Sequence, residues 1–154
     1  MLKSVLNFIK KFVFSKKKNH DELDSPATNE TNKEILNKNL ILKNFYKDCY
    51  QIFKGEIENY DQLKILEIGS GAGFIKKFIP NAITSEIIEL EGVDLTINAE
   101  HLPFTDKSLD VIILLNVIHH ITNSEKFLKE CHRVLKHDGQ ILLIEPANTW
   151  LSRI

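Results

Sequence analysis

A short apolar segment that runs directly into a glycine-rich turn constrains the fold of this chain more than any other feature. Residues 64–68 (KILEI) have the length and composition of a buried strand. Glycines follow at positions 69, 71 and 73, and glycine lets a backbone turn tightly and approach a ligand without interference from a Cβ atom. Residues 74–79 are predicted to form a helix that ends before Pro80, so its free N–H groups are expected to face the turn. This order of strand, turn and helix is typical of a ligand-binding βα unit.

Strand-like and helix-like segments continue to alternate along the chain. The apolar run Leu109–Leu115 (LDVIILL) is expected to be a central parallel strand, because such strands are buried on both faces. A helix predicted over 34–54 carries an aromatic stripe that includes Phe45 and Tyr46, and Cys49 is expected to lie in the core with it. The other predicted elements are strands at 82–86, 92–97 and 140–145 and a helix at 124–136. Together they predict an α/β fold, a Rossmann-like doubly wound parallel sheet.

The first 33 residues are predicted to stand apart from this fold. Apolar residues recur at helical spacing from Leu2 to Val13, with lysines largely on the opposite side, which predicts a basic amphipathic helix within residues 1–18. Such a helix binds either an anionic membrane surface or a protein surface on this chain or on a partner. Residues 19–33 are a predicted polar linker, and residues 34–154 are predicted to form one domain.

Charge and cysteine content argue against several function classes. The net charge of −1 combines +6 over residues 1–18 with −7 over the rest, and so acidic a domain argues against general nucleic-acid binding. Cys49 and Cys131 are too few and too far apart in the sequence for a disulfide framework or a zinc ribbon. Cys131 and His132 are neighbours on a predicted helix and face different directions, so no metal site is expected. A reducing, cytoplasmic location is the simplest interpretation.

The glycine turn differs from two common nucleotide-binding motifs. A nicotinamide-binding GxGxxG motif requires glycine at position 74, where this chain has Phe74. The phosphate-gripping motif GxxxxGK[ST] does not occur in the sequence. Glu86, however, ends the second predicted strand, where a carboxylate accepts hydrogen bonds from both hydroxyls of a ribose. A nicotinamide-dependent oxidoreductase is therefore kept as a less favoured alternative.

Several motifs in one unbroken order carry a family resemblance. They are LEIGSGAGF, the strand-ending Glu86, AEHLPF, SLDVIILLNVIHHI and FLKECHRVLKHDGQILLIEP. The series resembles the class I S-adenosylmethionine-dependent methyltransferases, and more narrowly the methyltransferase type 11 domains, from about Lys64 to Pro146. The resemblance implies S-adenosylmethionine as the cofactor and a small molecule as the methyl acceptor.

The resemblance also implies a set of cofactor-binding residues. These are Glu67, Gly69, Ser70, Gly71, Gly73, Glu86, Asn98, Ala99, Leu102 and Asn116. The residues from 67 to 73 would shape the methionine end of the site, and Glu86 would hold the ribose hydroxyls. Asn98 and Ala99 would meet the edge of the adenine and Leu102 its face, while Asn116 would lie near the sulfonium. Asn98 stands where the family usually has aspartate, and its amide oxygen still accepts a hydrogen bond, although without a charge.

Two adjacent histidines are candidate catalytic residues. Methyl transfer from a sulfonium depends mainly on holding the nucleophile and the methyl group in line, and a base is needed only when the acceptor must lose a proton. A histidine suits that role because its pKa is near neutrality. His120 is slightly favoured over His119, and the alternative is that the pair only caps the turn after the fourth strand.

The fifth predicted strand raises a question about the completeness of the fold. The family's sheet has seven strands, whereas only nine residues follow Glu145, so a sheet that lacks the last two strands is expected. Three hypotheses follow: a working methyltransferase, a cofactor-binding module without activity, or a fragment of a longer enzyme. The exposed edge of strand 140–145 is expected to pair with another copy or a partner, or to cause aggregation.

Overall fold

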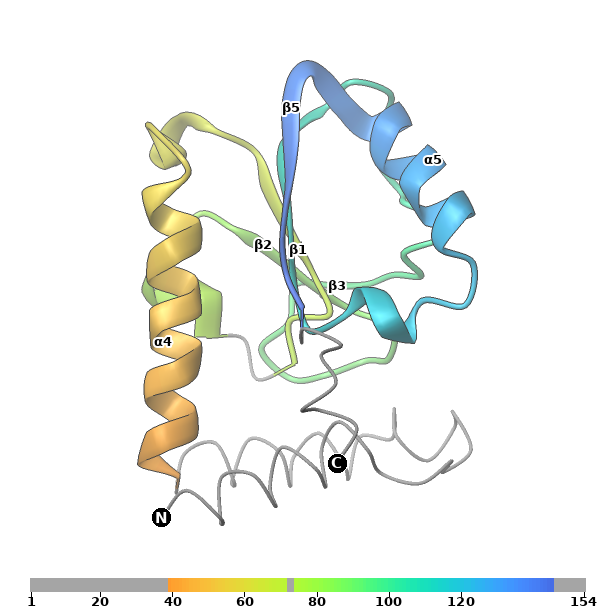
Figure 1. The fold of residues 1–154 in the computed structure, drawn as a ribbon. Coiled ribbons are helices and arrows are strands. Elements are labelled where there is room, and N and C mark those ends of the chain that lie inside the picture. The colour runs from red at the N-terminus through yellow and green to blue at the C-terminus, as the bar shows by residue number, and fades with distance from the viewer. Residues whose placement is uncertain (1–38, 72–73, 146–154) are drawn as a thin grey trace, which may run out of the picture.

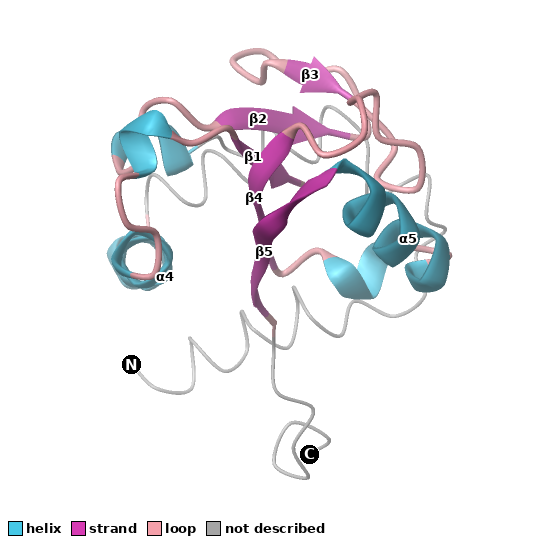
Figure 2. Cartoon of the chain, turned by 90° about the horizontal axis from the view of Figure 1, so that it is seen from above, coloured by secondary structure: helices cyan, strands magenta, loops and turns pink. Residues whose placement is uncertain are grey.

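The computed structural model describes residues 39–71 and 74–145. The predictions for the amphipathic segment 1–18, the linker 19–33, Gly73 and residues 146–154 lie outside the described residues. The described part is an α/β fold with one five-stranded sheet, in which all neighbouring strands are parallel and the order is β3-β2-β1-β4-β5. Helices α4 and α5 lie on opposite faces of this sheet (Figures 1 and 2). The predicted fold class is confirmed.

The bounds of the elements are as follows. The helices are α4 (Leu40–Gly55) and α5 (Ser124–Val134), and the short 3₁₀ turns are η1 (Tyr60–Gln62), η2 (Phe74–Lys77) and η3 (Ile118–His120). The strands are β1 (Ile65–Ile68), β2 (Ile83–Glu86), β3 (Leu95–Thr96), β4 (Leu109–Leu115) and β5 (Leu135–Ile144). No helix in this described part is long and apolar enough to cross a membrane.

Strand β4 explains why the core has two layers. Its side chains alternate between the faces of the sheet, so Val111 and Ile113 pack in the cluster with α4, and Ile112 and Leu114 pack in the cluster with α5. Both faces of β4 are therefore buried, which is why its sequence is almost continuously apolar. The prediction for Leu109–Leu115 is confirmed at both ends.

Helix α4 begins later than predicted. Asn39 has extended backbone angles, and its side chain accepts hydrogen bonds from the N–H groups of Ile41 and Leu42, which is the geometry of an N-cap. This helix therefore starts at Leu40, and the predicted residues 34–38 lie outside the described residues. Cys49 is buried as predicted, whereas Phe45 is 46% exposed and lies off the buried stripe.

Four other predicted elements or element ends differ clearly from the structure. The helix predicted over 74–79 is only the 3₁₀ turn η2, and the strand predicted over 92–97 is only the two-residue β3. Helix α5 ends at Val134 rather than residue 136, and β5 starts at Leu135 rather than residue 140. The cause is that Leu135 takes extended angles and pairs with Leu109 of β4, which removes it from the helix.

Candidate functional site

The residues with candidate functions gather at the carboxyl ends of β1, β2 and β4. In a parallel sheet, ligands bind beyond this edge where the strand order reverses, and β1 lies between β2 and β4 at that point. The turn 69–71 follows β1, Glu86 ends β2, and Asn116 follows β4. The topology therefore brings together the predicted site residues of three strands.

The turn after β1 has the backbone conformation that glycine tolerates. Gly69 and Gly71 have φ angles of +69° and +49°, in the left-handed region that other residues rarely adopt. A Cβ atom on Gly69 would lie 2.5 Å from Cγ2 of Val117, so this glycine lets the turn pack against the segment after β4. A Cβ atom on Gly71 would lie 4.0 Å from Oε1 of Glu86, and no other atom of the described residues beyond the chain neighbours is within that distance. The described residues therefore leave space for a ligand to approach the backbone of Gly71.

Glu86 is fixed to this turn by its carboxylate. Oε1 accepts a hydrogen bond from the Gly71 N–H at 2.8 Å, and Oε2 accepts one from the Ile87 N–H at 3.1 Å. These two bonds to backbone N–H groups orient the carboxylate at the carboxyl end of β2. The arrangement suits the predicted role of Glu86 toward a ribose.

Ser70 forms hydrogen bonds within the protein, through both its side chain and its backbone. Its hydroxyl oxygen accepts a hydrogen bond from the Ser85 N–H at 3.0 Å, and its own N–H donates to the Ser85 carbonyl at 2.9 Å. The Ser85 hydroxyl in turn donates to the carbonyl oxygen of Glu67 at 2.7 Å. These bonds tie the end of β1 to β2 and hold the turn in place.

Glu67 is a buried carboxylate with one oxygen unpaired. Its side chain is 1% exposed, and Oε1 accepts a hydrogen bond from the Tyr50 hydroxyl at 2.8 Å. Oε2 has no hydrogen-bond partner among the described residues. Burial raises the pKa of Glu67 from its ordinary value of 4.5 to about 7. Because an unpaired buried oxygen is costly, this atom is a natural acceptor for the N–H donors of a ligand.

Two tyrosines of α4 complete the site, and the sequence analysis treated them only as core residues. Tyr50 donates a hydrogen bond to Glu67. Burial raises the pKa of Tyr46, and the nearby Asn116 side chain offsets part of this rise. Asn116 itself has a φ angle of +59°, a conformation that asparagine adopts more readily than most residues. The spacing of four residues between two phenols on a helix face was a usable signal, since both groups must reach the same side of the helix.

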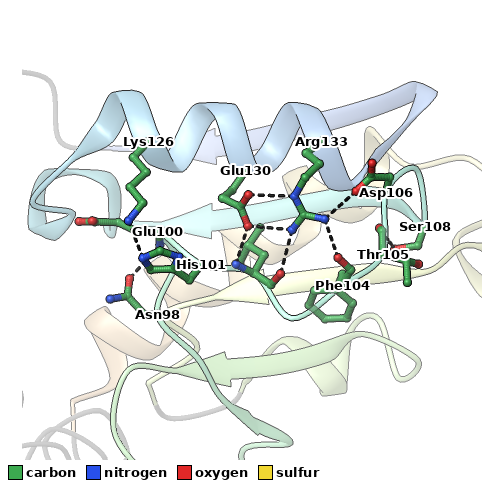
Figure 3. Close-up of polar contacts among 11 residues, drawn as sticks. Asn98, Glu100, His101, Phe104, Thr105, Asp106, Ser108, Lys126, Glu130 and Arg133 are labelled. Carbon is green, nitrogen blue, oxygen red and sulfur yellow. Dashed lines mark hydrogen bonds and ion pairs between the residues drawn. The ribbon is translucent and has the colours of Figure 1, made fainter.

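The predicted adenine-binding residues lie in the segment after β3, shown in Figure 3. Asn98 is exposed, and its side-chain oxygen accepts a hydrogen bond from the Glu100 N–H at 2.8 Å. Ala99 is half-buried against the core on the α5 side. The Leu102 side chain is only 4% exposed and packs in the same core. The three residues therefore follow one another along the segment, with Asn98 the most accessible of them.

Helix α5 holds this segment through Glu130 and Arg133, which we call the α5 clamp (Figure 3). Arg133 donates hydrogen bonds to the carbonyl oxygens of Leu102 and Phe104 at 2.9 and 2.8 Å. Glu130 accepts one from the Leu102 N–H at 2.8 Å. Arg133 also pairs with Glu130 itself, and this contact lowers the pKa of Glu130 to about 2. The clamp was not predicted from the sequence, although an acid and an arginine three residues apart on a predicted helix are a usable signal for such a pair.

The histidine pair lies beside the same edge of the sheet. His119 and His120 belong to η3, directly after Asn116 and Val117, and both are exposed. Their ring centroids are 4.1 Å apart with the planes tilted by 43°. Glu145, which follows β5, contacts this segment and was not singled out from the sequence. The rule that identified Glu86, an acid at the carboxyl end of a strand, also applies to Glu145.

Comparisons with known proteins agree with this geometry. A family model described as a methyltransferase domain matches residues 66–143, which is half of the chain. The ubiquinone/menaquinone biosynthesis C-methyltransferase of Haemophilus ducreyi is 30% identical over 129 residues, covering 68% of this chain and 47% of that protein. The uncharacterized methyltransferase YcgJ of Bacillus subtilis is 33% identical over 101 residues, covering 53% of this chain and 40% of that protein. The chain spans about half or less of the length of the curated relatives it matches.

Solved structures give the same result. The crystal structure of YcgJ from Bacillus subtilis has a TM-score of 0.56 and 27% identity, covering 62% of this chain and 49% of that one. A methyltransferase structure from Methanococcus maripaludis has a TM-score of 0.57 over 90% of this chain and 69% of that one, and at 14% identity it supports the fold alone. With the glycine turn, the anchored Glu86 and the matched region in agreement, the chain belongs to the methyltransferase domain family of class I S-adenosylmethionine-dependent enzymes.

Proposed function

We propose that this chain binds S-adenosylmethionine over the turn 69–71 and transfers its methyl group to a small-molecule acceptor. The observation that carries the proposal is Oε2 of the buried Glu67, which has no hydrogen-bond partner among the described residues and lies beside the turn 69–71. The methionine end of the cofactor carries an ammonium group, which offers N–H donors and a positive charge to such an oxygen. The residues present therefore fit the cofactor.

The other roles follow the position of each residue. Glu86, oriented by the Gly71 and Ile87 N–H groups, would accept hydrogen bonds from the ribose hydroxyls. Asn98 and Ala99 would meet the adenine edge, and Leu102 would support the adenine face from below, because its side chain is in the core. Asn116, close to Tyr46 of α4, would line the pocket near the sulfonium. Ser70 and Gly69 would shape the turn from inside.

The chemistry depends on position more than on reactive side chains. When bound, the cofactor supplies an electrophilic methyl group on a positively charged sulfur. The protein has to hold an acceptor in line with that methyl group, which accounts for much of the rate of such displacements. Fixed backbone contacts at 69–71 and 116–118 serve this purpose. The Haemophilus ducreyi relative is named for C-methylation in quinone biosynthesis, which supports a small organic acceptor.

The proposal also covers the class of acceptor, the cellular location and contact with a membrane. The acidic charge of residues 19–154, −7 in total, supports an acceptor other than nucleic acid. Cys49 and Cys131 are free thiols, which suits a cytoplasmic location. The basic residues 1–18 are proposed to contact an anionic membrane surface, where quinone-like acceptors dissolve.

The test is isothermal titration of the full chain with S-adenosylmethionine and S-adenosylhomocysteine, followed by a transfer assay. The wild-type chain should bind both, and Gly71→Val should abolish binding, because a branched side chain would fill the space above the turn. Transfer of a labelled methyl group is then measured with prenylated benzoquinols and naphthoquinols as probe acceptors. Binding without transfer would identify a cofactor-binding module without activity. Binding of reduced nicotinamide cofactor in place of S-adenosylmethionine would replace the proposal with an oxidoreductase.

A further inference from the structure

The carboxylate of Glu145 joins the end of β5 to the segment that follows β4. Oε1 accepts hydrogen bonds from the N–H groups of Val117 and Ile118 at 2.7 and 2.9 Å. Oε2 lies 2.6 Å from Nδ1 of His119. One side chain therefore fixes both the backbone of the segment and the ring of a candidate catalytic residue. The Glu145 side chain is 16% exposed and that of His119 is 42% exposed, so the histidine ring is accessible from solvent while the carboxylate is largely buried.

This contact determines which ring nitrogen of His119 carries a proton. A carboxylate accepts hydrogen bonds and does not donate them, so Nδ1 must be the protonated nitrogen. In the neutral ring Nε2 then has an available lone pair. A histidine whose tautomer and orientation are fixed by a carboxylate is prepared to accept a proton at its other nitrogen.

We propose that His119 is the general base of the methyl transfer and that Glu145 is its positioning residue. The inference rests on the proposed function. It assigns the role of base to His119, whereas the sequence alone slightly favoured His120. It also narrows the acceptor to a compound whose attacking atom loses a proton, such as an acidic hydroxyl or the ring carbon of a quinol.

In the proposed step, the methyl group moves to the acceptor and a proton moves from the acceptor to His119. The lone pair of the acceptor forms a bond to the methyl carbon while the carbon–sulfur bond breaks and its electron pair remains on sulfur, which becomes a neutral thioether. The proton released by the acceptor passes to Nε2 of His119. The resulting imidazolium carries a positive charge next to Oε2 of Glu145, and this pairing stabilises it.

The first experiment measures the tautomer and needs neither cofactor nor acceptor. In the ¹⁵N-labelled full chain, the His119 signal is assigned as the one lost in His119→Gln. Its Nδ1 should have the chemical shift of a protonated nitrogen and its Nε2 that of an unprotonated one. Glu145→Gln should reverse this pattern, because the amide oxygen can still accept from the backbone while the amide nitrogen cannot accept from Nδ1. A wild-type ring protonated at Nε2 would overturn the proposal.

The second experiment locates and tests the base. Diethyl pyrocarbonate acylates unprotonated ring nitrogens, and mass spectrometry maps the product. His119 should be modified, and saturating S-adenosylhomocysteine should slow its modification several-fold but not that of His132, an exposed residue of α5. In the transfer assay His119→Gln should lower kcat about 100-fold with little change in the dissociation constant of S-adenosylmethionine, whereas His132→Gln should have no effect.

The outcomes separate the two proposals. If S-adenosylmethionine does not bind, the proposed function fails, while the tautomer measurement still decides whether Glu145 fixes the ring of His119. If the cofactor binds and methyl transfer proceeds at the wild-type rate in His119→Gln, the general-base assignment is wrong and the proposed function stands. An unmodified His119, or one whose modification S-adenosylhomocysteine does not slow, also contradicts the assignment.

Discussion

The hydroxyl of Tyr50 donates a hydrogen bond of 2.8 Å to Oε1 of the buried Glu67, while Oε2 of the same carboxylate has no partner among the described residues. One carboxylate oxygen of Glu67 is thus hydrogen-bonded to α4, while the other has no such partner among the described residues and lies beside the turn 69–71. Burial raises the pKa of Glu67 to about 7. A buried acceptor without a partner favours binding of a cationic group. It also lowers the stability of the folded protein when no ligand is bound.

The first prediction is that Glu67 makes the stability of the protein depend on pH. Because the pKa of Glu67 in the folded protein, about 7, is above its ordinary value of 4.5, the folded state binds this proton more tightly than the unfolded chain does. The stabilisation is complete below about pH 4.5 and is lost as the pH rises through 7. Between pH 5 and pH 8 the free energy of unfolding should fall by about 2 kcal/mol more in the wild type than in Glu67→Gln.

Urea denaturation of both proteins at the two pH values measures this difference. Glutamine keeps an oxygen that accepts the Tyr50 hydrogen bond and cannot ionise, so it isolates the charge from the contact. Tyr50→Phe is the matched control for the contact, since it removes only the hydroxyl. Equal pH dependence in the wild type and Glu67→Gln would mean that Glu67 does not titrate in this range.

The second prediction is that S-adenosylmethionine binds more weakly as the pH falls below 7. If the ionised form of Glu67 holds the ammonium group, protonation of Glu67 competes with binding. The ammonium group stays charged in this range, because α-amino groups have pKa values of roughly 8. Affinity at pH 5.5 should therefore be about tenfold lower than at pH 7. Calorimetry in buffers of different ionisation enthalpy should show proton release on binding, and both effects should disappear in Glu67→Gln.

The third prediction concerns the carboxylate that is anchored to the glycine turn. Glu86→Gln should lower the affinity for S-adenosylmethionine by roughly tenfold, because hydrogen bonds to a charged acceptor are worth about 1 kcal/mol or more above neutral ones. The melting temperature should change less, since the amide oxygen can still accept from Gly71. Glu89→Gln is the matched control, because Glu89 is an exposed glutamate three residues further along. A loss of the same size in Glu89→Gln would point to general electrostatics instead.

The sequence predicted an element well where its residue pattern fits only one type of secondary structure. The seven-residue run Leu109–Leu115 fits only a strand buried on both faces, and it was located without error. The end of α5 was not predicted correctly, because Val134 and Leu135 fit the amphipathic pattern of the helix as well as they fit the start of a strand. Pairing of Leu135 with Leu109 decides the boundary, and that contact spans 26 residues of sequence.

The site shows the same division between local and distant information. Glu86 was identified because its position at a strand end is a local property. The roles of Glu130, Arg133 and Glu145 depend on backbone groups of segments 27 to 31 residues away, and no local pattern specifies such partners. The family resemblance supplied the residues predicted to bind the cofactor, and it did not supply Glu130, Arg133 and Glu145, which contact the segments that carry them.

The fourth prediction tests the α5 clamp. Arg133→Lys should weaken binding of adenosine and of S-adenosylmethionine by a similar factor of several-fold, because one ammonium cannot replace the planar fork that reaches both the Leu102 and Phe104 carbonyl oxygens. Binding of methionine alone should not change. Lys129→Arg is the matched control, because it also exchanges one basic side chain for the other, at an exposed position of the same helix. Equal losses for adenosine and methionine would show that the variant disturbs the whole fold rather than the segment after β3.

The last prediction concerns the free edge of the sheet. In the described part of the chain β5 pairs with β4 on one side and forms the edge of the sheet, with Leu143 48% exposed. Lys136 and a register irregularity lie near its first half, and such features discourage pairing between edges. The second half, Ile141 to Ile144, has neither feature. We expect the chain to associate through this half, with another copy or a partner.

Light scattering and sedimentation of the full chain across a concentration series measure this association. Leu143→Lys should shift the chain toward monomer with little loss of melting temperature, because the replaced side chain is half exposed and a charge on an edge opposes pairing. Leu128→Lys is a matched control, since Leu128 is 47% exposed on α5, away from the edge. If both variants reduce association equally, general surface hydrophobicity is responsible. If the wild-type chain remains monomeric at high concentration, the edge of β5 is covered and the prediction is wrong.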